Sequence, residues 1–274
     1  MKCNHLLRAV TAATVLATAS LSASAGLVVL DGWQLVTPTI NITNIGRLNL
    51  VSGTATVQQE VNAANTAFVG AKFSEFGSIF SLSYTKENVV GAGDTGSPLG
   101  LGETLTLAFT NVLGHVTALN AGGGFKYVFD SGSLLLSGAS GNYASGSIIG
   151  IGGNLSATAI VGGVNGDSTL LASIGAILNA SFDLKDSLGA SLKPDLLAGK
   201  VLFEGVTNNN TTSSTGFGAC TFTPLVAGDR CQTFSVASAG DGYLLRNVPE
   251  PGSIALFGLG LMGLAAMRRR KSVE

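Results

Sequence analysis

Histidine, tryptophan and basic residues are scarce in this sequence, and each shortage argues against a class of function. The 274 residues include two histidines, one of them at position 5, and a single tryptophan, Trp33. A serine hydrolase needs a histidine as general base, and no Gly-x-Ser-x-Gly motif supplies a nucleophile to pair with His115. Glycosidases that use two carboxylates need no histidine, but they generally line their clefts with aromatic side chains. We therefore predict no catalytic residues and expect a protein that is not an enzyme.

Charge separates the two ends of the chain from its middle. The whole sequence has a formal net charge of −1, but residues 26–247 hold nine Lys and Arg against fourteen Asp and Glu, a net charge of −5. Nucleic-acid binding depends on clustered cations that contact phosphates. We therefore predict no nucleic-acid partner.

Two glycine-rich motifs have the composition of cofactor or metal sites. Residues 91–96, GAGDTG, have the spacing of a dinucleotide loop, but Pro98 follows where the helix that binds the phosphates should begin. Residues 162–167, GGVNGD, resemble a calcium-binding turn, in a single copy without the repeats that would complete an oxygen cage. Asp183 and Asp186 leave weak calcium binding open. We predict a surface loop at 91–96, no metal site and no cofactor.

The N-terminus has the three parts of a secretory signal peptide. A cationic start precedes an apolar or small stretch at 9–23, and the ASA sequence that ends at Ala25 fits the small-residue rule for cleavage before Gly26. We predict that residues 1–25 are a signal peptide, that signal peptidase removes it, and that the protein is exported.

The C-terminal segment, residues 248–274, reads VPEPGSIALFGLGLMGLAAMRRRKSVE. Its apolar run, about 254–267, has 14 residues without a charge, fewer than the roughly 20 that a helix needs to span hydrocarbon. The run is followed by four cations whose side chains can extend toward a membrane face, namely Arg268, Arg269, Arg270 and Lys271. Export of the residues before the run and retention of these cations in the cytoplasm agree on one orientation. We predict a marginal helix that anchors the protein in the inner membrane.

The order of these features resembles a known sorting signal. Pro249, Glu250 and Pro251, an apolar helix and an Arg-rich tip are similar to the PEP-CTERM signal of Gram-negative bacteria. The resemblance implies that exosortase, a membrane protease-transpeptidase of species that make extracellular polysaccharide, recognises this end. Anchoring would then be transient, with final placement at the cell surface or in the extracellular matrix. A second likeness, to flocculation-associated PEP-CTERM proteins, rests on FSEFGSIF at 73–80 and FKYVFDSGSL at 125–134.

The cysteines fit an exported protein. Cys3 lies in the predicted signal peptide, which leaves Cys220 and Cys231 as an even pair in an oxidising compartment. Two thiolates and one distant histidine do not complete four zinc ligands. We predict a disulfide between Cys220 and Cys231.

Apolar and polar residues alternate with a period of two in the middle of the chain. Residues 80–84, 105–109 and 125–129 read as half-buried antiparallel strands, with the serines of the first run on the solvent face. We predict that residues 26–247 form a mainly β domain, an antiparallel β-sandwich or a jelly roll.

Other segments read as connections or stay open. Clusters of Gly, Ser, Asn and Thr predict turns or loops at 91–102, 122–124, 137–146 and 207–218. Leu171, Ile174 and Leu178 have helical spacing, but the β-rich surroundings also allow a strand there.

Two functions of different classes fit these patterns. We expect a non-catalytic surface or extracellular-matrix protein that exosortase sorts and that associates with exopolysaccharide in a biofilm or floc. The alternative is a secreted carbohydrate-active domain, a lectin-like binder or a glycosidase, with the same sorting signal. A polar surface with few aromatic residues favours the first.

The signal-peptide prediction has a direct test. N-terminal sequencing of exported protein should give Gly-Leu-Val-Val, the residues from Gly26, because the ASA site follows the apolar stretch at once. An N-terminus that retains Met1 would contradict export by this route.

Overall fold

The computed structural model describes residues 26–87, 96–100, 102–120, 124–155, 165–223, 226 and 230–248. The predicted signal peptide, the Pro249 to Pro251 motif, the apolar run at 254–267 and the basic tail lie outside these residues, as does most of the 91–96 motif. No helix among the described residues is long and apolar enough to cross a membrane.

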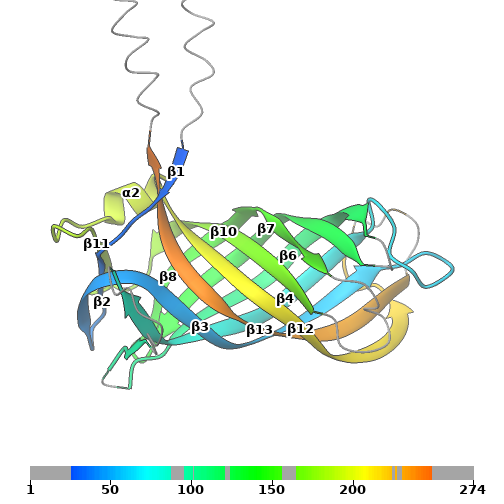
Figure 1. The fold of residues 1–274 in the computed structure, drawn as a ribbon, viewed down its shortest axis with the longest axis horizontal. Coiled ribbons are helices and arrows are strands. Elements are labelled where there is room, and N and C mark those ends of the chain that lie inside the picture. The colour runs from blue at the N-terminus through cyan, green and yellow to red at the C-terminus, as the bar shows by residue number, and fades with distance from the viewer. Residues whose placement is uncertain are drawn as a thin grey trace, which may run out of the picture. The chain divides into compact units, whose positions relative to one another are not determined.

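A ring of eight antiparallel strands makes up most of the described chain (Figure 1). In ring order they are β3 (Asn41–Glu60), β4 (Lys72–Lys86), β6 (Leu105–Leu119), β7 (Phe125–Gly138), β8 (Gly141–Gly150), β10 (Asn165–Ile177), β12 (Val201–Ala219) and β13 (Arg230–Val248). The last strand returns to the first, because β13 pairs with β3 from Cys231 opposite Glu60 to Gly242 opposite Leu48. The sheet is therefore a closed barrel, and it lies within one compact unit, Val29–Arg246.

Shorter elements complete the described structure. They are β1 (Gly26–Val29), β2 (Trp33–Val36), β5 (Ser97–Pro98), β9 (Gly152–Leu155), β11 (Asp183–Lys185) and the helix α2 (Lys193–Leu197). β2 pairs with both β3 and β11, and β9 joins β7 and β10 beyond the end of β8.

The ring corrects the predicted fold class. The chain is mainly β and antiparallel, as its alternation predicts, but the sheet closes on itself and is neither a sandwich nor a jelly roll. Alternation is the same in all these folds, because each has one apolar face per sheet. The difference lies in the pairing of β3 with β13, strands at opposite ends of the domain.

Two clusters of apolar side chains fill the interior. One joins the barrel to β2, β11 and α2 through Trp33, Phe182 and Leu196, all buried. The other is rich in aromatic rings: Tyr127 packs edge-to-face against Phe73 at 5.4 Å and Phe129 at 5.5 Å. Such pairs add to the free energy of burial because ring edges and faces carry opposite partial charge.

A buried carboxylate ties three connections together at one end of the ring. Glu103 accepts hydrogen bonds from the hydroxyls of Thr37, Thr39 and Tyr143 and from the Ala139 N–H. Burial alone would raise the pKa of Glu103, but these donors together outweigh it and lower the pKa. Glu103 therefore stays ionised and holds the residues before β3, before β6 and between β7 and β8 against one another.

Several local predictions need correction. Residues 207–218, predicted as a loop, belong to β12, which is paired with β13 over its whole length. Residues 137–146, also predicted as a loop, are mostly the end of β7 and the start of β8. The segment left open between helix and strand is a strand, because Leu171 to Ile177 belongs to β10. Among the serines expected to face solvent in the 80–84 run, Ser81 is fully buried, and its hydroxyl donates to the Ser83 carbonyl.

The structure contains the predicted disulfide between Cys220 and Cys231, whose Cα atoms are 5.0 Å apart. The bridge closes the connection from β12 to β13. Two residues within this connection also bond to β3: Thr221 donates to the Gln58 side chain, and the Val226 N–H donates to Glu60. The bridge therefore holds the β12–β13 connection beside the strand that completes the ring.

Removing the bridge should destabilise the barrel. We expect Cys220→Ser to lower the free energy of unfolding by about 3 kcal/mol, since a short closed loop no longer restricts the unfolded chain. Thermal and denaturant unfolding of the variant and the parent protein measures this difference. The parent in reducing buffer is the control and should behave like the variant, and an unchanged midpoint in both would contradict a structural role.

Candidate functional site

Strand pairing is irregular on both sides of β4. The β3–β4 register shifts between Val51 and Thr54, and the β4–β6 register shifts between Glu75 and Gly77. Ser52 on β3 and Asn111 on β6 have φ angles of 52° and 51°, in the left-handed region that non-glycine residues rarely adopt. β-Bulges of this kind re-aim side chains and are common beside functional sites.

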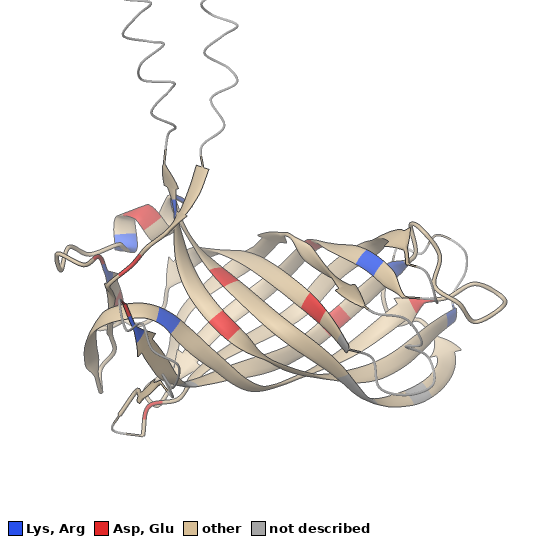
Figure 2. Ribbon diagram, in the orientation of Figure 1, with Lys and Arg blue, Asp and Glu red and all other residues tan. Residues whose placement is uncertain are grey.

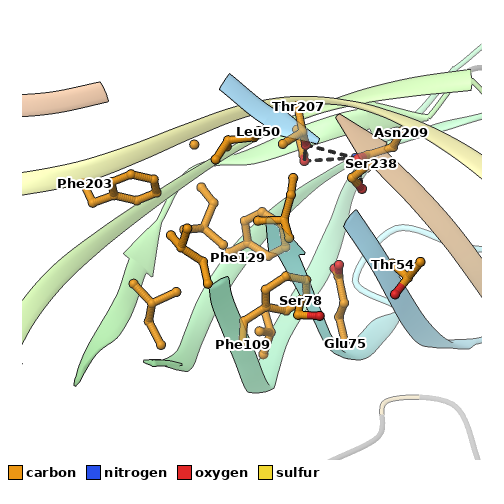
Figure 3. A pocket seen from close by; sticks show the side chains of 17 residues that line it. Leu50, Thr54, Glu75, Ser78, Phe109, Phe129, Phe203, Thr207, Asn209 and Ser238 are labelled. Atoms are coloured by element: carbon orange, nitrogen blue, oxygen red, sulfur yellow. Dashed lines mark hydrogen bonds between the residues drawn. The ribbon is translucent and has the colours of Figure 1, made fainter. Parts of the chain in front are cut away.

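A cavity of about 60 Å³ lies inside the barrel at this height (Figure 3). Most of its wall is apolar, including Leu107, Phe109, Phe129 and Leu134. By a volume of roughly 15 Å³ for each water-sized group, it has room for about four non-hydrogen atoms. A second cavity of about 30 Å³ extends toward the aromatic cluster and shares Glu75 and Asn209 with the first.

Polar side chains form one side of the cavity and bond to one another. Asn209 Oδ1 accepts from Thr207 Oγ1 at 3.1 Å and Ser238 Oγ at 2.7 Å, and Asn209 Nδ2 donates to Ser168 Oγ at 2.9 Å. Because Thr207 gives its proton to Asn209, Ser168 is the donor in the 2.7 Å contact between Ser168 and Thr207. These four residues therefore form one hydrogen-bonded group without a ligand.

Glu75 differs from these residues. Its carboxylate points from β4 into the cavity, toward the side where Asn209 and Ser238 lie (Figure 3). It makes no hydrogen bond or ion pair with another residue in the part of the chain that the structure describes. The side chain is partly exposed, and it lines the cavity. Burial raises the pKa of Glu75 from 4.5 to about 7.

The titratable neighbour of Glu75 is Tyr127, on β7. Burial raises the pKa of Tyr127, and the charges of Glu75 and Asp167 raise it further. Hydrogen bonds with Ser168 and Asn209 lower this pKa, but by less. The Tyr127 phenol therefore stays neutral across the range in which Glu75 titrates.

The outer wall of the barrel carries rows of uncharged polar side chains. On β3, Thr56 and Gln58 alternate with the buried Ala55 and Val57 and so point outward. Across the strands, Ser213 on β12, Ser235 on β13, Thr56 on β3 and Phe76 on β4 form one register row.

The adjoining row, formed by Thr233, Gln58 and Ser74, has the same character. Phe76 is 54 % exposed, an aromatic ring among hydroxyl and amide groups. Acidic and basic residues are sparse along these strands (Figure 2).

Residues 247–271 match a family model, described as the PEP-CTERM protein-sorting motif. The chain carries a PEP-CTERM sorting signal. The match includes the Pro249, Glu250 and Pro251 motif and the basic residues 268–271, and it confirms the resemblance drawn from the sequence. A PEP-CTERM signal implies an exported protein that exosortase sorts to the cell surface. No curated protein and no solved structure matches the chain.

The barrel that accompanies the PEP-CTERM signal brings together residues that the sequence does not connect. Glu75 lies within the 73–80 stretch and Phe129 within the 125–134 stretch, the two segments noted for a likeness to flocculation-associated proteins. Both residues line the cavity. One feature of the sequence could have revealed the site: Thr207 and Asn209 are polar and both point inward, in a segment that we predicted as a loop.

The other residues singled out from sequence lie elsewhere. His115 Nδ1 is 3.0 Å from the Asp130 carboxylate on the outer wall, and Lys72 Nζ lies 3.8 Å from the same carboxylate. Asp183 accepts from the Ser191 hydroxyl, and Asp186 accepts from two backbone N–H groups of its own turn. Among the described residues, no group of three or more His, Cys, Asp or Glu side chains is arranged to hold a metal ion.

The raised pKa of Glu75 makes barrel stability depend on pH. The native state holds the proton up to about pH 7, whereas the unfolded chain releases it near 4.5, so its stabilising effect is complete below pH 4.5 and lost as pH rises through 7. Glu75→Gln stays neutral, so we expect it to exceed the parent in unfolding free energy at pH 8 by up to roughly 3 kcal/mol, with little difference near pH 4.5.

Chemical denaturation between pH 4.5 and 8 measures this profile. Glu204→Gln is the matched control: burial also raises the pKa of Glu204, but that side chain points outward and keeps more contact with solvent, so its profile should change less. Parallel profiles for the parent and Glu75→Gln would show that Glu75 is not desolvated in the folded protein.

Proposed function

We propose that this PEP-CTERM protein is a non-catalytic component of the cell surface or extracellular matrix that binds exopolysaccharide. The observation that carries the proposal is the uncharged polar wall formed by the outward side chains of β12, β13, β3 and β4. Hydroxyl and amide groups both donate and accept hydrogen bonds, as do sugar hydroxyls. A wall without clustered charge suits a polymer whose contacts are mainly hydroxyl groups.

The geometry of the wall adds to this argument. Neighbouring strands of a sheet lie about 4.8 Å apart, so Ser213, Ser235 and Thr56 present hydroxyls at regular intervals along one line. Phe76 ends that line with an exposed ring that can stack on the apolar face of a sugar. A polysaccharide with a repeating unit can therefore contact hydroxyl groups that recur at a regular spacing.

The sorting signal supplies the context for such binding. Exosortase-dependent sorting delivers the barrel to the surface, and we propose that inner-membrane anchoring by the C-terminal run is transient, in a Gram-negative host. Association with exopolysaccharide there would contribute to biofilm or floc formation. The likeness of the 73–80 and 125–134 stretches to flocculation-associated proteins supports the same role.

A lectin-like domain is the second candidate, and the exposed Phe76 among polar rows favours it over a glycosidase. A glycosidase places two carboxylates on either side of the scissile bond. Glu75, the carboxylate of the 73–80 stretch, faces the interior cavity instead, where a polysaccharide has no room.

Binding to the host's own polysaccharide tests the proposal. The exported protein should co-sediment with purified exopolysaccharide, and Phe76→Ala should weaken binding on the order of tenfold, because an aromatic contact is worth about 1 kcal/mol or more. Ile149→Ala is the matched control: it removes a similarly exposed apolar side chain from β8, which is not part of this wall.

The same samples separate the alternatives. Equal retention of both variants and the parent would place binding elsewhere, and no retention of the parent would refute the proposal. Release of reducing sugars by the parent protein would show a glycosidase.

A further inference from the structure

The Glu75 carboxylate accepts no hydrogen bond from another residue in the part of the chain that the structure describes. A carboxylate that is desolvated and has no partner is unfavourable when ionised, and no neighbouring polar group bonds to Glu75. Asn209, Thr207, Ser168 and Ser238 bond to one another, and none of them donates to Glu75. The Glu75 carboxylate therefore has no donor among the described residues, and a ligand with a donor group would supply one.

Water suits the polar side of this cavity better than its apolar side. A buried water molecule makes about three hydrogen bonds to polar groups, and a space of about 60 Å³ is large enough for several waters. Glu75 and the side formed by Ser168, Thr207, Asn209 and Ser238 are polar, whereas the wall near Leu107, Phe109 and Leu134 is apolar. The site thus provides one strong acceptor and an apolar compartment beside it.

We propose that the cavity binds a small primary amine, whose ammonium group donates to the Glu75 carboxylate while its short alkyl chain lies against Leu107, Phe109 and Leu134. The volume limits the ligand to about four non-hydrogen atoms, the size of propylamine. The positive charge offsets the buried negative charge, and the rings of Phe109 and Phe129 add a face that attracts cations.

The strands around Glu75 are arranged for access. The regular ladder is interrupted on both sides of β4, near Ser52 and near Asn111. Fewer backbone hydrogen bonds hold β4 at this height, so local opening here is easier than elsewhere in the ring. Barrels of eight strands have interiors that side chains fill or that hold one small ligand.

Binding should depend on pH in a defined direction. The amine is protonated at both pH 5 and pH 8, whereas Glu75, with a pKa of about 7, is ionised only at the higher pH. At pH 5 the complex forms only if a proton is released, so affinity should fall about a hundredfold from pH 8 to pH 5. Tyr127, the titratable group near Glu75, is neutral throughout and does not contribute to the change.

Calorimetric titration of the full chain in mild non-ionic detergent, with propylamine hydrochloride, tests the proposal. We expect saturable binding at pH 8, about a hundredfold weaker binding at pH 5, and no binding of hexylamine, which exceeds the cavity. Glu75→Gln should weaken propylamine binding by tenfold or more, as the loss of a hydrogen bond to a charged group predicts. Glu204→Gln, which changes an outward carboxylate on β12, should bind as the parent does.

Other outcomes overturn the proposal. Propan-1-ol that binds as tightly as propylamine at both pH values would show an apolar cavity without amine recognition. Hexylamine that binds as well as propylamine would place binding outside this cavity, and absence of propylamine binding at millimolar concentration would reject the site. The pH comparison uses the unaltered protein, so it decides the question even if Glu75→Gln does not fold. None of these results depends on whether the outer wall binds polysaccharide.

Discussion

The pairing of β13 with β3 is the constraint on which the rest of the structure depends. This ladder joins the two ends of the domain and leaves each of the eight ring strands with a partner on both sides. A ring of eight strands encloses a narrow space that its own side chains must fill. Phe203, for example, fits inside because Gly242 faces its ring: a Cβ at Gly242 would lie 2.9 Å from the ring. Closure therefore determines which residues are buried, including the acidic ones.

Closure also explains what the sequence predicts well and what it does not. Inward and outward residues alternate regularly in the runs at 105–109 and 125–129, because the inward residues are all apolar. These runs belong to strands β6 and β7. A sandwich and a barrel give the same alternation, so only the long-range pairing of β3 with β13 tells them apart. The sorting signal needs no such pairing: its three parts are contiguous, and it is recognisable without a structure.

The wrong prediction for residues 207–218 has a physical cause that bears on function. A strand is recognised in a sequence when one of its faces is apolar and the other is polar. At residues 207–210 both faces of β12 are polar, since Asn208 and Asn210 point outward while Thr207 and Asn209 point inward. Long ladders with β10 and β13 override the loop-like composition. Polar residues placed inside a barrel conceal the strand in the sequence, and they also mark the cavity wall in the structure.

The bulges near Ser52 and Asn111 connect the interior site to the outer wall. On β3 the inward residues have even numbers before the bulge, Leu48 and Leu50, and odd numbers after it, Ala55 and Val57. This change of parity sets Thr56 and Gln58 on the outer face, and without it both side chains would enter the core. The bulge near Ser52 thus affects both faces of the sheet. It loosens the ladder beside Glu75 on the inside, and it aligns the hydroxyl row that meets Phe76 on the outside.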